Sequence, residues 1–353
     1  MKSKIVKFLC MGIVIFLGSV FLFQEAWGAS IKQIKNGKTV YVLKMATLAP
    51  NGVGWAALIK TILIPEILKV TNGQVVLDWY YGGTMGDDQD VIAKMRNGQL
   101  QGGGFSGQGV MLACPEMALM ELPLMFNNYD EVEYLYSKLR PRINQWFEKS
   151  GYHFILLAEQ DFDQLYSTKH ELRTPEDFKK SRILTWYGHL EEKTLKALGA
   201  SPIPIRVPEV AASIHTGVCD AFVSPSIWAV GTQIYVSMKY VNPVRLRYSP
   251  AAAVVSMEAW NQLPKEYQIA IDNFGMPREK EFRRLIRESN EKCIKAMIKY
   301  GMTETKLTPA EIDVWKKRVL PVWDEFAAKG YYSKAELAEV KALLAEYRAK
   351  NKK

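Results

Sequence analysis

The sequence of 353 residues has few of the residues that build metal sites and disulfide frameworks. It contains four cysteines and four histidines. None of them follows a paired-cysteine or His-Glu-x-x-His spacing, and the histidines stand apart from one another. A Gly-x-Ser-x-Gly nucleophile motif is also missing. We therefore predict no metal, no cofactor and no catalytic residue.

Long apolar runs are scarce as well, and the one that exists lies at the N-terminus. Three lysines precede an apolar run over residues 8–23, and the small-x-small site Ala26-Trp27-Gly28 follows it. This order is typical of a secretory signal, so we expect residues 1–28 to be cleaved near Gly28 and the protein to be periplasmic. A retained membrane anchor is the alternative, because the run is nearly long enough to span a bilayer.

Charge gives little indication of a macromolecular partner. The formal net charge is +9, but part of the excess lies in the signal and part in the C-terminal AEYRAKNKK. Neither segment interleaves basic and aromatic residues as nucleic-acid sites do. The sequence therefore predicts no nucleic-acid partner.

The stretch LQGGGFSGQGV matches the G-x-G-x-x-G spacing at Gly102, Gly104 and Gly107. A dinucleotide site needs a strand before the first glycine and an acidic residue about 20 residues later. Here a predicted helix over residues 87–97 comes first, and LPLMFNNYDE lies where the acidic strand end is required. We interpret the glycines as a loop that allows close approach to the backbone.

Strand and helix patterns alternate along the chain, which predicts an α/β fold. The helical pattern that begins after Pro264 is long enough to join two lobes. Strands are expected over residues 39–47, 74–81, 151–159, 181–188, 219–223, around Val244 and over 251–257; helices are expected over 55–70, 130–149, 190–198 and 209–216.

Five segments, in this order, resemble the DctP-like solute-binding proteins of tripartite ATP-independent periplasmic (TRAP) transporters. The similarity runs from about Val42 to about Gly330. The segments are KMATLAPNGVGWAALIKTILIPEILKVTNGQVVLDWYYGGTMGDDQDVIAKMRNGQ, PEMALMELPLMFNNYDEVEYLY, TPEDFKK, ALGASPIPIRVPEVAASIHTGVCDAF and MEAWNQLPKEYQIAI.

The resemblance implies a two-lobe periplasmic-binding-protein-like fold with an interlobe ligand cleft and a long connecting helix. It implies a receptor that closes on a small organic solute and delivers it to TRAP permease membrane subunits, with an accessory periplasmic lipoprotein as a further possible partner. A secreted or periplasmic α/β enzyme is the alternative function. A structural protein with a filled cleft is a third. The expected parts are lobe I (38–158 plus 243–275), lobe II (159–242 plus 276–330) and a C-terminal helix with a basic tail (331–353).

The sequence departs from the family pattern at three positions. Where carboxylate-binding members have arginines, this sequence has Leu184 and Asp163, and Ser224 replaces a family asparagine. Leucine donates no hydrogen bond, and an aspartate repels a carboxylate. A two-residue shift would instead place Arg182 in the arginine position, and Arg206 is a second candidate for a displaced positive charge.

We therefore expect a hydrophobic or aromatic solute, with a carboxylate as the alternative, held by rings and bare backbone. Some of these rings are equally consistent with lobe cores. The expected ligand-binding residues are Trp55, Gly104, Phe105, Ser106, Asp163, Tyr166, Leu184, Trp186, Tyr187, Phe222, Ser224 and Trp228.

Overall fold

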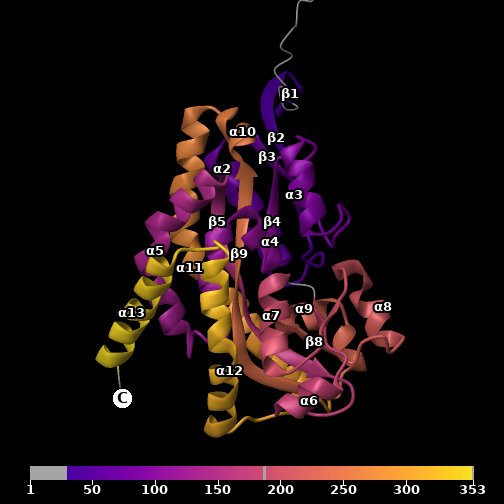
Figure 1. Cartoon of the computed structure of the whole chain (residues 1–353). Coiled ribbons are helices and arrows are strands. Elements are labelled where there is room, and N and C mark those ends of the chain that lie inside the picture. Colours follow the sequence, from indigo (N-terminus) through magenta and orange to yellow (C-terminus); the bar gives the residue numbers. More distant parts are fainter. Residues whose placement is uncertain (1–29, 186–187, 352–353) are drawn as a thin grey trace, which may run out of the picture.

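The computed structural model describes residues 30–185 and 188–351 as a mixed α/β protein (Figure 1). The strands are β1 (Lys32–Lys35), β2 (Lys38–Thr47), β3 (Val75–Tyr80), β4 (Gly102–Ser106), β5 (Tyr152–Ser167), β6 (Leu184–Thr185), β7 (Ile203–Pro204), β8 (Ala221–Ser224), β9 (Tyr240–Ser256) and β10 (Thr303–Glu304). The α-helices are α1 (Trp55–Leu58), α2 (Ile64–Val70), α3 (Asp88–Arg96), α4 (Gln108–Ala113), α5 (Tyr129–Lys149), α6 (Pro175–Lys180), α7 (His189–Leu198), α8 (Val210–His215), α9 (Ser226–Gly231), α10 (Met257–Asn261), α11 (Lys265–Lys299), α12 (Pro309–Ala328) and α13 (Lys334–Lys350). Among the described residues, a short π-helix, η1 (Ile59–Leu63), and the short 3₁₀ helices η2 (Pro115–Met120), η3 (Val207–Glu209) and η4 (Ile234–Ser237) complete the elements.

One sheet of eight strands passes through both lobes. Its order is β1-β2-β4-β9-β5-β8, with β3 beside β2 and β10 beside β9; β6 and β7 form a separate small sheet. The first lobe contains β1–β4 with α1–α4 and α10, and the second contains β6–β8 with α6–α9. Figure 1 shows β5 and β9 running from the first lobe, at the top, to the second lobe below.

The two crossing strands pair antiparallel from Tyr152↔Ser256 to Ser167↔Tyr240. Their register shifts between Glu159 and Asp161 and again between Asp163 and Leu165. Asp161 has φ of 84°, a conformation that a residue with a side chain rarely adopts. Irregular pairing of this kind lets a strand bend, so the connection between the lobes is built from bent, paired strands.

The glycine-rich segment is a strand and not the loop predicted from its sequence. β4 lies in the middle of the sheet between β2 and β9. A Cβ atom on Gly104 would lie 2.4 Å from the Trp55 ring, and one on Gly102 would lie 2.4 Å from the carbonyl oxygen of Val254. The glycines are needed because rings and neighbouring backbone pack against the strand.

The helix α11 joins the lobes, as expected, but it is one element of 35 residues with Pro277 inside it. It packs along β5 and contacts α1 and α2 of the first lobe and α9 of the second. The expected lobe boundaries at 158/159 and 242/243 fall within β5 and β9, and the boundary at 275/276 falls within α11. All three therefore lie in elements that connect the lobes.

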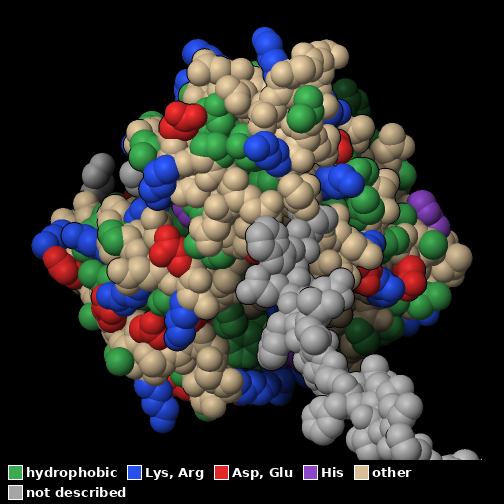
Figure 2. All heavy atoms as spheres, turned by 90° about the horizontal axis from the view of Figure 1, so that it is seen from above, with side chains coloured by type: hydrophobic (Ala, Val, Ile, Leu, Met, Phe, Trp, Pro, Cys, Tyr) green, Lys and Arg blue, Asp and Glu red, His purple; other side chains and the backbone are tan. Residues whose placement is uncertain are grey.

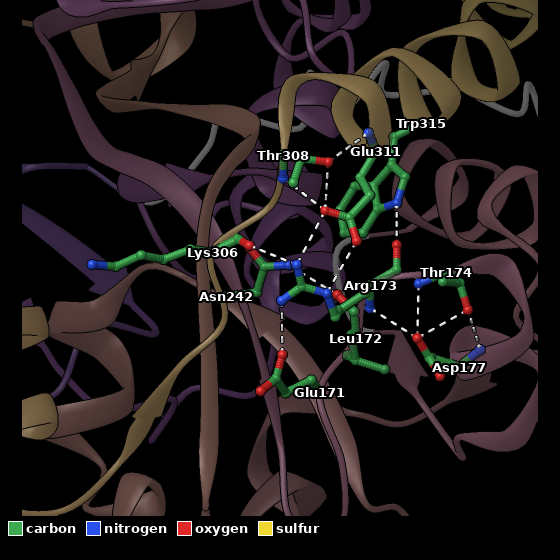
Figure 3. A network of polar contacts seen from close by, with 10 residues as sticks. All are labelled: Glu171, Leu172, Arg173, Thr174, Asp177, Asn242, Lys306, Thr308, Glu311 and Trp315. Atoms are coloured by element: carbon green, nitrogen blue, oxygen red, sulfur yellow. Dashed lines mark hydrogen bonds and ion pairs between the residues drawn. The ribbon is translucent and has the colours of Figure 1, made fainter.

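Helix α12 is attached to the second lobe through a polar network (Figure 3). Arg173 forms ion pairs with Glu311 at the start of α12 and with Glu171, and it donates to the carbonyl oxygen of Lys306. The indole of Trp315, one helical turn further, donates to the carbonyl oxygen of Arg173 at 2.8 Å. From this anchor α12 leads to α13, which packs on α5.

On the face shown in Figure 2, the basic, acidic and apolar side chains of the described residues are intermixed. The three described cysteines are free; Cys114 and Cys219 are buried, and Cys293 is partly exposed. Within residues 30–185 and 188–351, every helix is too short or too polar to span a bilayer.

Candidate ligand site between the lobes

Two openings lie along the boundary between the lobes. The larger has a volume of about 340 Å³ and is lined by Leu48, Asp87, Asp88, Gln89 and Gln108 of the first lobe and by Thr185, Gly188, His189, Glu192, Pro204, Ile205, Arg206 and Val207 of the second. The smaller is a narrow crevice lined by Ala49, Pro50, Val53, Gly54 and Trp55 of the first lobe, Gln160 of β5, and Ile227 and Trp228 of the second. Residues of both lobes line each opening, and the crevice has a volume of about 10 Å³, which is room for about one water molecule in this conformation.

Ion pairs cross the larger opening. The Arg206 guanidinium lies 2.9 Å from Asp87 Oδ2 and also pairs with Asp90. Both carboxylates belong to the capping box of α3, so they are held in place by the helix N-terminus. Arg206 is therefore paired across the lobe boundary.

The carboxyl group of Asp88 lies beside these pairs and is buried. Burial, with the neighbouring charge of Asp87, raises the pKa of Asp88 to about 8. The interlobe boundary therefore contains a carboxyl group that titrates near neutral pH.

Aromatic side chains from both lobes reach the crevice. Trp55 packs against Gly104, and Trp228 packs edge-on to Phe222 with ring centroids 6.3 Å apart. Phe222 stacks in turn on Tyr166 at 4.9 Å. The Trp55 indole nitrogen and the Tyr166 hydroxyl are buried, and neither has a hydrogen-bond partner in the described chain. Of these four predicted site residues, Trp55 and Trp228 line the crevice, whereas Phe222 and Tyr166 are fully buried in the core of the second lobe.

The end of β4 contributes backbone and one hydroxyl to this region. Ser106 accepts a hydrogen bond from Gln160 Nε2 at 2.6 Å, and Gln160 lines the crevice. Phe105 points elsewhere: it is buried in the core of the first lobe beside Val110 and Met111. Gly104 and Ser106 therefore contact the crevice-lining residues Trp55 and Gln160 and do not line the crevice themselves.

A buried polar cluster occupies the strand crossing. Arg247 of β9 donates from Nη1 to Glu121 Oε2 at 2.6 Å and from Nε to Asp163 Oδ2 at 2.8 Å. All three side chains are almost completely buried, with Arg247 2% exposed. Burial raises the pKa of Glu121 to about 8 and raises that of Asp163 as well, against the opposing effect of Arg247. We call these three residues the Arg247 cluster.

Asp163 is among the site residues predicted from the sequence, whereas Arg247 and Glu121 are not. Asp163 faces Arg247 in the β5–β9 register, 84 positions apart along the chain. An arginine just before the apolar run YSPAAAVVS is a usable signal, because a charge so close to a fully buried strand needs a partner. Its partners become visible only when the strand register is known.

Two further predicted residues are buried in the second lobe. Leu184 belongs to the same apolar cluster as Tyr166 and Phe222. The Ser224 hydroxyl donates to the carbonyl oxygen of Pro225 at 3.1 Å. Trp186 and Tyr187 lie outside the described residues.

The alternative cations are engaged with protein carboxylates. Arg182 is half-exposed and donates to Asp220 at 3.1 Å, and Arg206 forms the interlobe pairs described above. Among the residues that the structure describes, no group of three acidic, histidine or cysteine side chains is arranged to hold a metal ion.

Comparisons with known proteins match this architecture. Residues 64–330 match the model of "Bacterial extracellular solute-binding protein, family 7" (DctP). The C4-dicarboxylate-binding periplasmic protein DctP of Rhodobacter capsulatus is 24% identical over 281 residues, which are 79% of this chain and 84% of that protein. The ectoine-binding periplasmic protein TeaA of Halomonas elongata is 26% identical over 267 residues, covering 72% and 76%.

A solved structure shares the fold. The TRAP periplasmic solute-binding protein of Haemophilus influenzae with bound L-gulonate superposes with a TM-score of 0.79 at 19% identity, covering 86% of this chain and 99% of that one.

The comparisons confirm the two-lobe α/β fold and the solute-receptor class. They do not support the enzyme alternative, because the family consists of receptors and not enzymes. Such receptors are extracytoplasmic, bind small organic solutes and work with TRAP permease components. With a family match over residues 64–330, the chain belongs to family 7 of the bacterial extracellular solute-binding proteins, the DctP family.

Proposed function

We propose that this receptor binds a small organic solute with an apolar or aromatic body and encloses it between the two lobes for delivery to a TRAP permease. The observation that carries the proposal is that Trp55 and Trp228, from opposite lobes, line one crevice. Indoles from both lobes at one crevice favour a flat or apolar solute, because a solute that widens the crevice buries aromatic surface of both lobes.

The charged residues near the strand crossing favour a solute with an uncharged or apolar body over a small dicarboxylate. The guanidinium of Arg247 already pairs with two carboxylates, and Leu184 adds only apolar surface. A dicarboxylate placed beside Glu121 and Asp163 meets like charges whenever these carboxyl groups are ionised, and repulsion in a buried environment is weakly screened.

Lobe closure is the proposed mechanism of binding. The pairs of Arg206 with Asp87 and Asp90 span the lobe boundary, so they exist only when the lobes are together. The irregular pairing of β5 with β9 provides the place where the lobes rotate. A solute that contacts both lobes shifts the population toward the closed form.

The remaining parts of the proposal concern the cell. We propose that the segment 1–28 is a signal removed near Gly28, which places the mature receptor in the periplasm. An accessory periplasmic lipoprotein is proposed as a second partner beside the permease subunits. Sequencing of the mature N-terminus tests the cleavage, and co-purification from the periplasm tests the lipoprotein.

The ligand class is tested by native mass spectrometry of the mature protein, followed by a thermal-shift screen with aromatic acids, aromatic amines, fatty acids and short dicarboxylates. A ligand that binds only the folded form raises the melting temperature. Trp55→Leu and Trp228→Leu should each weaken binding of the best compound roughly tenfold or more. Trp146→Leu, in α5 away from both openings, is the matched control.

Two outcomes would contradict the proposal in whole or in part. Stabilisation by short dicarboxylates alone would leave the receptor but overturn the ligand class. If no solute co-purifies and no compound stabilises the protein, binding between the lobes is itself contradicted.

A further inference from the structure

The Arg247 cluster has unequal numbers of positive and negative groups. One guanidinium faces the carboxylates of Glu121 and Asp163, and all three side chains lie at the strand crossing away from solvent. When both carboxylates are ionised, the three residues together carry one excess negative charge. A buried excess charge is costly unless another group balances it, either the proton that burial holds on Glu121 near neutral pH or a cation from the solute.

The cluster also has unused hydrogen-bond acceptors. Each carboxylate bonds Arg247 through one oxygen, and the other oxygens, Glu121 Oε1 and Asp163 Oδ1, have no hydrogen-bond partner in the described chain. A buried acceptor without a donor is rare in a folded protein, since its lost contact with water is not replaced. These two oxygens therefore indicate a donor that binds later.

Two polar side chains close in the sequence to Asp163 and Arg247 also have buried atoms without hydrogen-bond partners among the described residues. The carbonyl oxygen of the Gln164 side chain, next to Asp163, is buried without a partner among the described residues. The hydroxyl of Ser249 is likewise unpartnered, and it lies two residues from Arg247 and so on the same side of β9. At the Arg247 cluster itself the two carboxylate oxygens, when ionised, only accept and the Ser249 hydroxyl can accept, so a solute group placed here must mainly donate.

We propose that the Arg247 cluster selects solutes by a hydrogen-bond-donating head, an ammonium, amidinium or primary amide group, and rejects a carboxylate head. This inference rests on the proposed function, because it assigns the polar end of the same solute whose body lies between Trp55 and Trp228. A cationic head binds best, since it supplies both the missing donors and the missing positive charge.

Matched compound series test the head group separately from the body. Benzamidine, benzamide and benzoate have one ring and one planar head, and differ in whether the head is cationic, neutral or anionic. The corresponding cyclohexyl and indolyl series vary the body. Thermal shift and isothermal titration of the full mature protein should rank cation over amide over carboxylate within each series, with at least a roughly tenfold gap between the first and the last.

Two isosteric variants locate the effect. Glu121→Gln leaves Arg247 with one carboxylate and a balanced charge, so the preference for the cation over the amide should disappear. Asp163→Asn should act in the same direction at the other carboxylate. Asp78→Asn, on the exposed side of β3, should leave the ranking unchanged. Circular dichroism checks that each variant is folded; if one is not, the other still tests the proposal.

The outcomes separate the two proposals. A carboxylate bound as tightly as its cationic partner in the wild type overturns the head-group inference and leaves the receptor intact. An unchanged cation preference in both folded variants overturns the assignment to the Arg247 cluster. If no member of any series binds, the head-group inference fails; if the broad screen also finds no ligand, the proposed function fails with it.

Discussion

Gly104 has no side chain, and this leaves space for the Trp55 ring to pack against the strand. A Cβ atom there would lie 2.4 Å from the Trp55 ring, which lines the interlobe crevice. We expect Gly104→Ala to lower the free energy of unfolding by about 1–3 kcal/mol through overpacking and to weaken solute binding because the indole is displaced. Chemical denaturation and isothermal titration measure the two effects.

A double-mutant cycle with Trp55→Ala is the control for this prediction. When the indole is already absent, a methyl group at position 104 has space, so Gly104→Ala should cost much less in that background. Equal costs in both backgrounds would show that the strain arises from other neighbours of Gly104.

Asp88 predicts a pH-dependent stability. Burial and the charge of Asp87 raise its pKa to about 8, whereas in the unfolded chain the carboxyl group titrates at about 4. Between these values the folded protein holds a proton that the unfolded chain has released, so the free energy of unfolding falls as pH rises through this window. Asp88→Asn removes this titration and keeps an amide in place of the carboxyl group.

We therefore expect Asp88→Asn to be more stable than the wild type at pH 8, by on the order of 1–3 kcal/mol, with the advantage shrinking toward about pH 4. Thermal unfolding across this range measures it. Some slope remains in the variant because Glu121 and Asp161 also have raised pKa values of about 8. Parallel curves for the two proteins would contradict the assignment to Asp88.

At the residue scale, the sequence predicts which kinds of residue lie near the crevice better than it predicts which residues contact one another. Trp55 and Trp228 do line a crevice together, and Asp163 is buried at the strand crossing, which its departure from the family pattern made notable. Phe105 illustrates the limit. Its position in the strand follows from the local sequence, but which face of the sheet the core covers depends on segments that are distant in the chain. The pairing of Asp163 with Arg247 depends in the same way on the register of two distant strands.

At the scale of elements, the sequence predicts the connecting strands only in pieces. The expected strand around Val244 and the one over 251–257 are one strand, β9, and the helical pattern that begins after Pro264 continues through Pro277 as α11. Proline usually marks an end, but a long helix tolerates one when tertiary packing compensates for the lost hydrogen bond. The strand expected over 181–188 is only Leu184–Thr185 within the described residues.

The attachment of α12 gives a prediction for one element. Trp315 is 1% exposed, donates to the carbonyl oxygen of Arg173 at 2.8 Å and packs edge-on to Phe178. Trp315→Phe leaves that carbonyl without its donor and a small cavity beside it, so we expect a loss of about 1–3 kcal/mol in the free energy of unfolding. Hydrogen exchange should speed up in α12 more than in α11.

Trp146→Phe is the matched control, since Trp146 of α5 is 6% exposed and its indole makes no hydrogen bond within the described part of the chain. The same substitution there removes similar volume without removing a polar contact. Equal destabilisation by both variants, with no selective change in α12, would mean that the Arg173 contact does not hold the helix.

For the whole molecule, the lobes share one sheet while each has its own apolar clusters. Residues such as Leu43, Ile59 and Val75 form a core in the first lobe, and Phe178, Leu195 and Leu198 form one in the second. The lobes can therefore move as units while β5, β9 and α11 remain paired. The contacts across the boundary, such as the pairs of Arg206 with Asp87 and Asp90, must break when the lobes separate.

Arg206 is the side chain through which closure is best tested. Its guanidinium joins the second lobe to Asp87 and Asp90 of the first, and it is more than half exposed. An exposed pair adds little to the stability of either lobe, but it is lost each time the lobes open. We expect Arg206→Ala to leave the melting temperature of the solute-free protein nearly unchanged and to speed solute dissociation roughly two- to fivefold. Stopped-flow displacement measures that rate.

Salt provides the second measurement. Raising ionic strength screens an exposed pair, so the wild-type dissociation rate should rise toward that of Arg206→Ala, while the variant should respond little. Arg284→Ala is the control because Arg284 pairs with Glu288 within α11 and joins no two lobes. If both variants release solute at the wild-type rate, the interlobe pairs do not contribute to the closed form, and closure depends on the solute and the aromatic crevice alone.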